Sequence, residues 1–347
     1  MSGYARVQIP TAAIATLLTA DAGRTKKLRA CEASKFTDTC GEDHVSDLKL
    51  FKLRDEGVEE IEGKSVAVEK SLQNLIEKHL EELLGIKFLA SEYSTGKMHG
   101  GRIDTLGIDE NRCPAIIEYK RAINENVINQ GLYYLNWLVD HKGEFELLAW
   151  KQLGKGSSEQ IEWGNPRLVC IAGDFTRYDE HAVQQMNRNI ELVRYRKYGK
   201  DLLLFELVNA TTAETPEVEP GKARQAKGTA KGVAARLAQS DAGLRDLFES
   251  LKSFLMALGD DVQKKNLKFY FAFKRLKNFA CVEIHPQTHR LVVFVKVDPK
   301  GVSLKDGFTR DVSEIGHYGT GNLEITIRSM EDFERAKPLI VQSYESS

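Results

Sequence analysis

Apolar residues recur at a spacing of three and four over residues 66–84, which is typical of a helix with one buried face. That face carries Leu72, Leu75, Ile76, Leu80, Leu83 and Leu84. Gly85 follows directly and favours the end of a helix. Similar patterns predict further helices over residues 126–141 and 179–189.

Short apolar or alternating runs lie between these helices and predict β-strands. They occur at residues 48–61, where a hairpin is expected, and at residues 86–93, 102–109, 115–120, 168–172, 190–196 and 202–207. The order is therefore helix, three strands, helix, strand, helix and two strands. Such interleaving predicts the α/β class, with a mostly buried sheet flanked by helices.

The composition changes after this region. Residues 210–235 contain few large apolar residues and many Pro, Gly, Thr and Lys, which is typical of a linker. Residues 1–45 lack a sustained period, so we expect a weakly ordered extension there. These boundaries leave an α/β domain at residues 46–209 and a smaller α+β domain at residues 236–347.

The smaller domain is predicted to combine helices with strands. The helices lie at residues 242–258 and 335–344, and the strands at residues 267–274, 279–284, 291–297 and 323–327. In the first strand, Lys268, Tyr270 and Lys274 alternate with apolar residues, so we expect an outward basic and aromatic face that is compatible with nucleic acid. Lysines that protect an edge strand from aggregation are the alternative explanation. Glycines at residues 316–321 permit a tight turn or the close approach of a ligand.

The overall composition is that of an ordinary soluble protein, with 42% hydrophobic and 29% charged residues. Because the net charge is −1, any contact with a polyanion must rely on a local basic patch. The five cysteines are scattered and form no CxxC pair, which argues against a disulfide framework or a zinc site. No apolar stretch reaches the roughly 18–20 residues that span a membrane, and the N-terminus lacks the basic start of a secretory signal. We therefore expect a cytoplasmic protein with no membrane contact.

Candidate chemistry gathers in residues 101–121. Asp104 lies in one predicted strand, while Glu118 and Lys120 end the next and share one face, because alternate residues of a strand point to the same side. If the strands pair, two carboxylates and an ammonium converge. Mg²⁺ prefers oxygen ligands and keeps several waters, so the two carboxylates and the carbonyl of Tyr119 could hold Mg²⁺ or Mn²⁺. The lysine could orient or deprotonate a water, which suits hydrolysis of a phosphodiester bond.

The spacing of Glu118 and Lys120 is by itself weak evidence for a catalytic pair. The same spacing recurs at Asp47/Lys49, Glu62/Lys64 and Asp298/Lys300. The context of the pair is distinctive, because it ends an apolar run where a charge is costly unless it is used. A solvated run of charges at a strand end is the alternative.

The next predicted helix adds Gln130 and Tyr134, which lie four residues apart and therefore on one helical face. Together with Asp104, Glu118 and Lys120, they form a pattern that resembles the QxxxY branch of the PD-(D/E)XK nucleases. The pattern is similar to RecB-type and NucS-type endonuclease domains.

The resemblance covers residues 47–209 and departs from the motif at Ile103, which stands where the motif has proline. It implies a restriction-endonuclease-like core and a glutamate from the first helix at the site. Glu77 matches that glutamate best, with Glu81 as its neighbour. It also implies that the two residues of the QxxxY motif help to hold the DNA strand and the geometry of the site. A core position for the motif tyrosine and an exposed position for Glu77 are the alternatives.

These features together predict a Mg²⁺- or Mn²⁺-dependent nuclease that acts on DNA. Nucleic-acid contacts are assigned to Arg102, Arg121, Arg194, Arg196, Lys268, Tyr270 and Lys274. Glu92 lies near the start of the site and could assist. A homodimer is expected by analogy with NucS-type enzymes. A nuclease-like fold that only binds nucleic acid or protein is the alternative. The C-terminal domain resembles a small bacterial domain of unknown function, which implies no mechanism.

Overall fold

The computed structural model describes residues 48–55, 57–64, 70–120, 127–154, 161–212 and 232–347, without the side chains of Lys64 and Lys120. The extension predicted at residues 1–45 and most of the predicted linker lie outside these residues. Residues 49–347 form one compact unit.

The N-terminal part of this unit carries the first sheet and its helices. In chain order the elements are β1 (Leu50–Arg54), β2 (Gly57–Ile61), β3 (Gly63–Lys64), α1 (Lys70–Lys78), α2 (Leu80–Leu84), β4 (Ile86–Ser94), α3 (Gly96–His99), β5 (Arg102–Asp109), β6 (Pro114–Lys120), α4 (Val127–Asp140), α5 (Lys142–Leu153), β7 (Arg167–Ala172), α7 (Arg177–Gln184), β8 (Asn189–Tyr198) and β9 (Leu202–Thr211). Strands β1 and β2 form the predicted hairpin.

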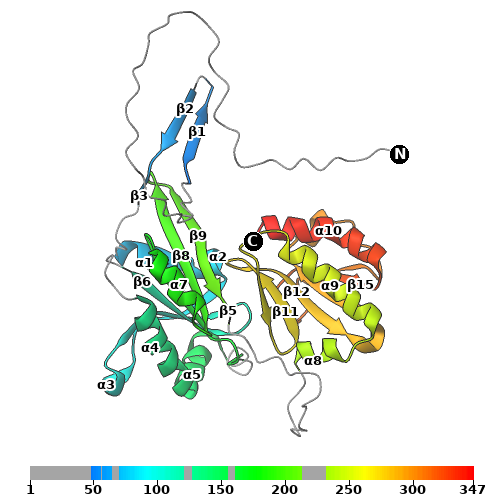
Figure 1. The fold of residues 1–347 in the computed structure, drawn as a ribbon, viewed down its shortest axis with the longest axis horizontal. Helices are drawn as coiled ribbons and strands as arrows, with labels where there is room; N and C mark the ends of the chain where they lie inside the picture. The colour runs from blue at the N-terminus through cyan, green and yellow to red at the C-terminus, as the bar shows by residue number, and fades with distance from the viewer. Residues whose placement is uncertain (1–47, 56, 65–69, 121–126, 155–160, 213–231) are drawn as a thin grey trace, which may run out of the picture. The chain divides into compact units, whose positions relative to one another are not determined.

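Seven strands form a mixed sheet in the order β3-β8-β7-β6-β5-β4, with β9 paired to β8 (Figure 1). Strands β4, β5 and β6 are antiparallel neighbours, whereas β6, β7 and β8 run parallel. Helices α1 and α2 cover one face of the sheet, and α4, α5 and α7 cover the other. The predicted α/β fold with a mixed sheet flanked by helices is therefore confirmed.

The central strands are apolar because both of their faces are covered. All six residues of β7 are buried, and residues 115–117 of β6 have no exposed surface. Helix α4 packs closely on β7 at Gly131, where an added Cβ would lie 2.4 Å from a methyl group of Leu168. Helix α7 begins with a capping box, in which Thr176 and Asp179 each accept a backbone hydrogen bond from the other.

The C-terminal part carries the second sheet. In chain order its elements are α8 (Val233–Ala238), α9 (Ala242–Met256), β10 (Gln263–Asn266), β11 (Tyr270–Lys274), β12 (Asn278–His285), the 3₁₀ turn η1 (Pro286–Thr288), β13 (Arg290–Val295), the 3₁₀ turn η2 (Pro299–Gly301), β14 (Thr309–Asp311), β15 (Leu323–Ile327) and α10 (Met330–Glu345).

This second sheet is wholly antiparallel, in the order β10-β11-β12-β13-β15-β14 (Figure 1). Its core faces the helices α8, α9 and α10, through residues such as Leu251, Phe271, Val293 and Ile340. A separate sheet with helices on one face is the smaller α+β part that the sequence predicts.

Three details of the elements differ from the sequence predictions. The single helix predicted at residues 66–84 is divided into α1 and α2. The division lies at His79, whose backbone leaves helical geometry (φ −117°, ψ 27°). Leu80 and Leu84 of α2 are both buried. Helix α5 was not predicted, since Phe145 and Ala149 are its only fully buried residues and give no clear helical period. The strand predicted at residues 267–274 begins only at Tyr270, because residues 267–269 form the turn that joins β10 to β11.

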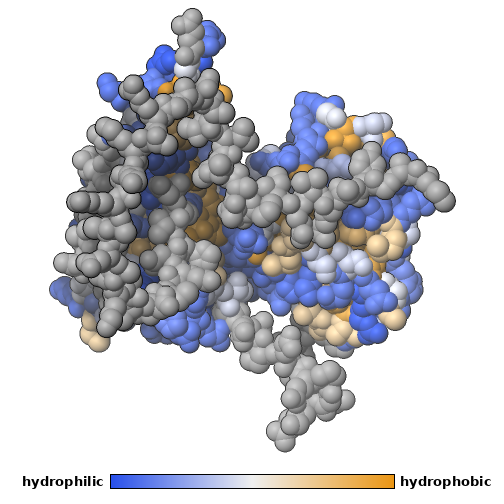
Figure 2. Space-filling view, turned by 45° about the horizontal axis from the view of Figure 1, so that its top comes forward, coloured by the Kyte–Doolittle hydropathy of each residue, from blue (hydrophilic) through white to orange (hydrophobic). Residues whose placement is uncertain are grey.

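On the face shown in Figure 2, the described residues are mainly hydrophilic, with hydrophobic residues interspersed. Exposed large apolar side chains include Leu53, Met98 and Leu304. Among the described residues, no helix is long and apolar enough to cross a membrane.

The second face of the C-terminal sheet packs against the turn between β5 and β6. Cys113 from that turn is buried in one apolar cluster with Leu267, Tyr270 and Cys281. Next to it, the side-chain amide of Asn278 donates to Asn111 Oδ1 at 2.8 Å, and the hydroxyl of Tyr270 donates to the same oxygen at 3.0 Å. The two sheets are therefore joined by a packed and hydrogen-bonded junction.

Buried charges complete this junction. Arg167 at the start of β7 donates to Asp109 Oδ2 at 2.9 Å and to both carboxylate oxygens of Glu191 at 3.0 and 2.7 Å. From the second sheet, Lys274 Nζ donates to Glu191 Oε1 at 2.9 Å, and Lys265 Nζ lies 3.6 Å from the same oxygen. All five side chains are almost fully buried, so each charge depends on its partners in place of water.

The sequence prediction of an outward face formed by Lys268, Tyr270 and Lys274 is wrong for two of the three residues. Lys268 is exposed, but Tyr270 is 6% exposed and Lys274 is buried. Their polar groups point at Asn111 and Glu191. The alternating pattern is real, but the first sheet covers the face that it defines at Tyr270 and Lys274, and of the three residues only Lys268 reaches solvent.

Burial disfavours the charged form of every group at the junction, so it acts to raise the pKa of a carboxyl group and to lower the pKa of a lysine. Burial acts to raise the pKa of Glu191, but Arg167, Lys274 and Lys265 outweigh it and hold that pKa well below its usual range. For Lys274, burial and then the nearby Arg167 lower the pKa to about 7, against the opposing pull of Glu191. Burial also lowers the pKa of Lys265.

Lys274 should therefore make stability rise with pH. An unfolded lysine keeps its usual pKa of 10.5, so between pH 7 and about 10 the unfolded chain binds a proton that the folded chain does not. We expect the free energy of unfolding of the wild type to gain about 2 kcal/mol relative to Lys274→Met between pH 7 and pH 9. Urea unfolding at both pH values measures this difference.

The control is Lys300→Met, which removes an exposed lysine and should follow the wild type at both pH values. If Lys274→Met showed the same pH dependence as the wild type, Lys274 would be charged in the folded protein, contrary to this prediction.

Candidate active site

The two predicted carboxylates meet at one end of the β5–β6 pair. The register Thr105↔Ile117 places Asp104 across from Glu118. The backbone N–H of Asp104 donates to Glu118 Oε1 at 3.1 Å, and the N–H of Tyr119 donates to Asp104 Oδ2 at 3.0 Å. Glu118 is 1% exposed, whereas Asp104 is half-buried. The pair is thus held by the backbone of the opposite strand, with one carboxylate nearer to solvent.

Glu77 from α1 is hydrogen-bonded to Thr105, the residue that follows Asp104 in β5. Its Oε1 accepts hydrogen bonds from Thr105 Oγ1 at 2.7 Å, Ser91 Oγ at 2.8 Å and Gln73 Nε2 at 2.9 Å. Gln73 Nε2 also lies 3.4 Å from the carbonyl oxygen of Asp104. The alternative of an exposed helix charge therefore does not describe Glu77, which is half-buried and held by three donors.

The three donors to Glu77 were not predicted from sequence. Gln73 offered a signal, because it lies four residues before Glu77 on the same helical face and is fully buried. Ser91 and Thr105 gave no signal, since hydroxyl residues are common on strands. Glu81, the neighbour of Glu77 in the motif, lies instead 3.8 Å from Lys87.

The motif residues of α4 hold the start of β5. The hydroxyl of Tyr134 accepts from the backbone N–H of Arg102 at 3.1 Å, and Gln130 Nε2 donates to the same hydroxyl at 3.3 Å. The Tyr134 ring lies so close to Gly101 that an added Cβ would be 2.5 Å from a ring carbon. Because Arg102 is two residues before Asp104, these contacts fix the position of the strand that carries the first carboxylate.

Glu92 on β4 lies across from Asp104. The pairs Ser91↔Thr105 and Tyr93↔Ile103 set this register. The backbone of Glu92 has a φ of 51°, in the left-handed region that costs a non-glycine residue about 1 kcal/mol or more. Its carboxylate lies 2.7 Å from both Lys70 Nζ and Arg102 Nε. A strained acidic residue is therefore placed at the edge of the site.

Tyr119 contributes to the site only through its backbone. Its ring is 3% exposed and belongs to the apolar cluster under α1 and α2. Burial, together with the charges of Glu77, Asp104 and Glu118, raises the pKa of the phenol well above its usual range. The phenol therefore stays neutral, and the carbonyl oxygen is the group that Tyr119 can offer to a cation.

The described residues contain no group of three or more His, Cys, Asp or Glu side chains arranged to hold a metal ion. Asp104 and Glu118 alone still match the minimal set for Mg²⁺, which is commonly held by one or two carboxylates while it keeps several waters. The chemistry of this donor set therefore fits a hard cation and excludes a closed zinc-type site.

The predicted basic residues are placed differently from one another. The side chain of Lys120 lies outside the described residues, although its backbone ends β6 and pairs with Ala172. Arg121 also lies outside them. Arg102 is 66% exposed and ion-paired with Glu92 at the site.

The two arginines of β8 are less accessible. Arg194 is 13% exposed and pairs with Asp174 at 2.9 Å and Glu206 at 3.0 Å. Arg196 is half-buried and lies across from Leu204. Arg194 would have to leave two carboxylates in order to bind a phosphate.

Comparisons with known proteins complete the description. Residues 233–347 match the model of a family described as a domain of unknown function (DUF5655). An uncharacterized protein of Haemophilus influenzae is 27% identical over 304 residues, covering 85% of this chain and 99% of that protein. A solved structure of an EndoMS–dsDNA2 complex matches with a TM-score of 0.23 and 15% identity, covering 42% of this chain. The match spans 64% of the EndoMS chain.

The role of Tyr134 can be tested through stability. Tyr134→Phe keeps the ring against Gly101 but leaves the N–H of Arg102 without its acceptor, so we expect a loss of about 1 kcal/mol in the free energy of unfolding. Urea unfolding measures the loss. Tyr133→Phe is the matched control, because the Tyr133 hydroxyl is exposed and donates to the carbonyl of His99. Equal values for the two variants would contradict a positioning role for the Tyr134 hydroxyl.

Proposed function

We propose that Asp104 and Glu118 form the metal-binding centre of a nuclease that cleaves DNA. The observation that carries the proposal is the convergence of these two carboxylates at the end of the β5–β6 pair, with backbone N–H groups of Asp104 and Tyr119 fixing both. Burial of a charged carboxylate is costly, and a divalent cation at this position would offset part of that cost for the buried Glu118.

Asp104, Glu118 and the carbonyl of Tyr119 would hold Mg²⁺ or Mn²⁺. When bound, such an ion lowers the pKa of a coordinated water and neutralises charge on a phosphate. Asp104 is more accessible than Glu118, so the substrate phosphate is expected to approach at Asp104. Lys120, which follows on the same strand, is proposed to orient the attacking water.

Glu77 is proposed to act as a positioning residue. It accepts from Thr105, the neighbour of Asp104 in β5, and shares Gln73 with the backbone carbonyl of Asp104. Loss of this carboxylate would release the hydrogen bonds that hold β4, β5 and α1 together at the site. Gln130 and Tyr134 act at the same strand from the opposite side, through the N–H of Arg102.

The substrate class follows from the resemblance of the motif to DNA endonucleases, and DNA is therefore the substrate that we propose. Arg102 is the best-placed basic residue for a phosphate contact, because it is largely exposed and adjacent to the carboxylates. A homodimer, which would present two such centres to the two strands, is part of the same proposal. Its mass in solution can be measured by light scattering.

The test is cleavage of plasmid, linear duplex and single-stranded DNA with and without Mg²⁺ or Mn²⁺. We expect cleavage that requires the metal and falls at least 100-fold, on the order of the effect of losing a catalytic group, in Asp104→Asn, Glu118→Gln and Lys120→Ala. Glu77→Gln should lower the rate less than these variants do, because Glu77 acts through Thr105 and Gln73.

Glu62→Gln is the matched control, because Glu62 and Lys64 have the same spacing in the sequence and Glu62 is exposed. It should leave cleavage unchanged. Binding of DNA that is equal in wild type and Asp104→Asn, with no cleavage by either, would favour the alternative of a nucleic-acid-binding module without catalysis.

A further inference from the structure

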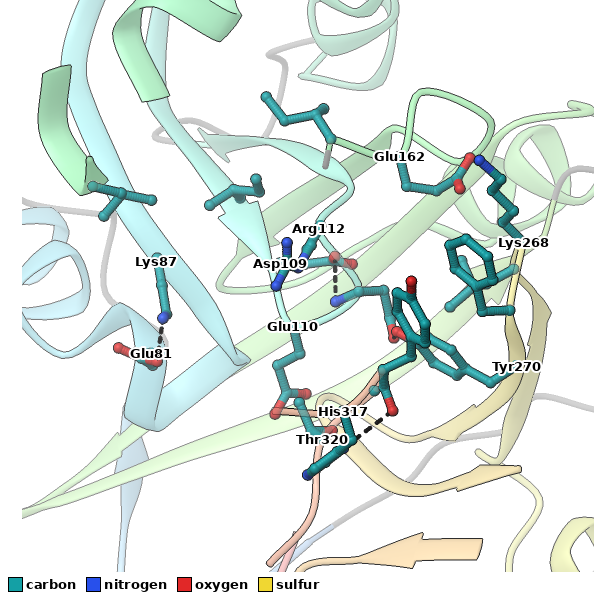
Figure 3. A pocket seen from close by; sticks show the side chains of 18 residues that line it. Glu81, Lys87, Asp109, Glu110, Arg112, Glu162, Lys268, Tyr270, His317 and Thr320 are labelled. Carbon is teal, nitrogen blue, oxygen red and sulfur yellow. Dashed lines mark hydrogen bonds and ion pairs between the residues drawn. The ribbon is translucent and has the colours of Figure 1, made fainter. Parts of the chain in front are cut away.

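A cavity of about 680 Å³ opens at the junction of the two sheets (Figure 3). It is lined by the β5–β6 turn, including Asn111 and Arg112, and by residues 267–270 and 317–320 of the C-terminal part. Asp109, which ends β5, also lines it. Asp109 lies five positions after Asp104 along the extended strand, a distance of about 17 Å, so this cavity is distinct from the candidate active site.

A stacked aromatic pair stands at this cavity. The rings of Phe269 and Tyr318 lie 4.1 Å apart and nearly parallel, with an interplanar angle of 18°. Tyr318 is 45% exposed, and Phe269 is half-buried. An exposed ring that is already supported on one side offers a rigid surface for a further planar group.

The glycine-rich stretch noted in the sequence fixes this ring in place. Gly319 has a φ of 84°, and an added Cβ would lie 2.7 Å from the Cβ of Cys281. On the other side of Tyr318, the ring of His317 stacks on Phe294 at 4.3 Å. The loop is therefore held against the sheet on both sides of Tyr318, and the exposed ring is positioned before any ligand binds.

Two cations flank the aromatic pair. Lys268 Nζ lies 5.1 Å from the centre of the Phe269 ring, and the guanidinium of Arg236 lies 5.7 Å from it. Arg236 also donates to the backbone carbonyl of Lys268 at 3.1 Å, which ties the two together. Among the residues that the structure describes, neither cation has a carboxylate partner within ion-pair distance.

The carboxylates that line the cavity are engaged by other groups. Glu110 pairs with Lys296, Asp109 with Arg167, and Glu81 with Lys87. Glu162 accepts from the backbone N–H of Gly164 at 3.0 Å and keeps its negative charge. Lys268 and Arg236 outnumber this one carboxylate, so the net charge beside the aromatic pair is positive.

We propose that this surface, formed by Arg236, Lys268, Phe269 and Tyr318, binds single-stranded nucleic acid. A base would stack on Tyr318, and the phosphates beside it would contact Lys268 and Arg236. The combination of a stacking ring with unpaired cations is the chemistry that single strands require. In a duplex the bases are already stacked on one another, so they are not available to stack on the ring of Tyr318. The binding does not depend on cleavage at Asp104.

The experiment measures the fluorescence anisotropy of a labelled oligodeoxythymidine strand with the full chain in EDTA, which prevents metal-dependent cleavage. Tyr318→Ala should bind about tenfold more weakly, because stacking of one base contributes about 1–3 kcal/mol. Tyr318→Phe should bind like the wild type, because the ring remains. Lys268→Ala should weaken binding and lower the slope of log K against log salt by about 0.7, the loss of one phosphate contact on a single strand.

Tyr178→Ala is the matched control, because Tyr178 is 70% exposed on α7, which does not line the cavity. It should leave the affinity unchanged. The proposal is overturned if Tyr318→Ala binds the strand as tightly as Tyr178→Ala, or if a duplex of equal length binds better and is insensitive to Tyr318. Because these measurements need no hydrolysis, absence of cleavage would refute the proposed nuclease activity and leave this result standing.

Discussion

The buried guanidinium of Arg167 is the interaction on which the rest of the structure depends. It forms ion pairs with Asp109 at the end of β5 and with Glu191 in β8. Arg167 itself belongs to β7, which lies in the middle of the sheet. Removing one partner from a buried charge network of this kind costs about 3–5 kcal/mol, because the remaining charge is left without water or a counter-ion. The network therefore fixes the relative positions of three strands and, through Lys274, of the second sheet.

Strand β5 connects this network to the two functional proposals. One end of the strand carries Asp104, opposite Glu118. The other end carries Asp109, which is ion-paired with Arg167. Both ends are fixed by groups from other elements: Tyr134 holds the backbone at the start, and the Asn111 turn is held by Tyr270 and Asn278 after the end. A strand that is fixed at both ends can position the carboxylate of Asp104 without the support of a loop.

Much of the fold follows from the sequence because its signals are local. The bounds of β5 agree exactly with the prediction at residues 102–109, and Gly85 does end α2 with a left-handed backbone. The convergence of Asp104 and Glu118 also follows from local information, since one short turn joins their strands. Helix α5 was missed because few of its residues are buried, so that its sequence lacks a clear period.

The charges at the junction could not be predicted for a different reason. Lys274 pairs with Glu191, which lies 83 residues earlier in the chain. The pattern of residues within one strand cannot predict a partner that is so distant in the sequence. The polar residues of the alternating face therefore predict exposure to solvent, although Tyr270 and Lys274 are buried. The stacked ring of Tyr318 was missed for the same reason, because its position depends on Gly319 passing close to Cys281 in another strand.

The family model matches the chain from residue 233 onward. The packed and charged junction, in contrast, includes residues on both sides of that position. A fragment cut at that position would expose the face of Tyr270, Lys265 and Lys274 to water and would leave the other fragment with Glu191 facing an open surface. The C-terminal part is thus completed by a carboxylate that lies outside the residues that the family model matches. Any transfer of this part to another protein would have to bring a counter-charge with it, or replace both lysines by apolar residues.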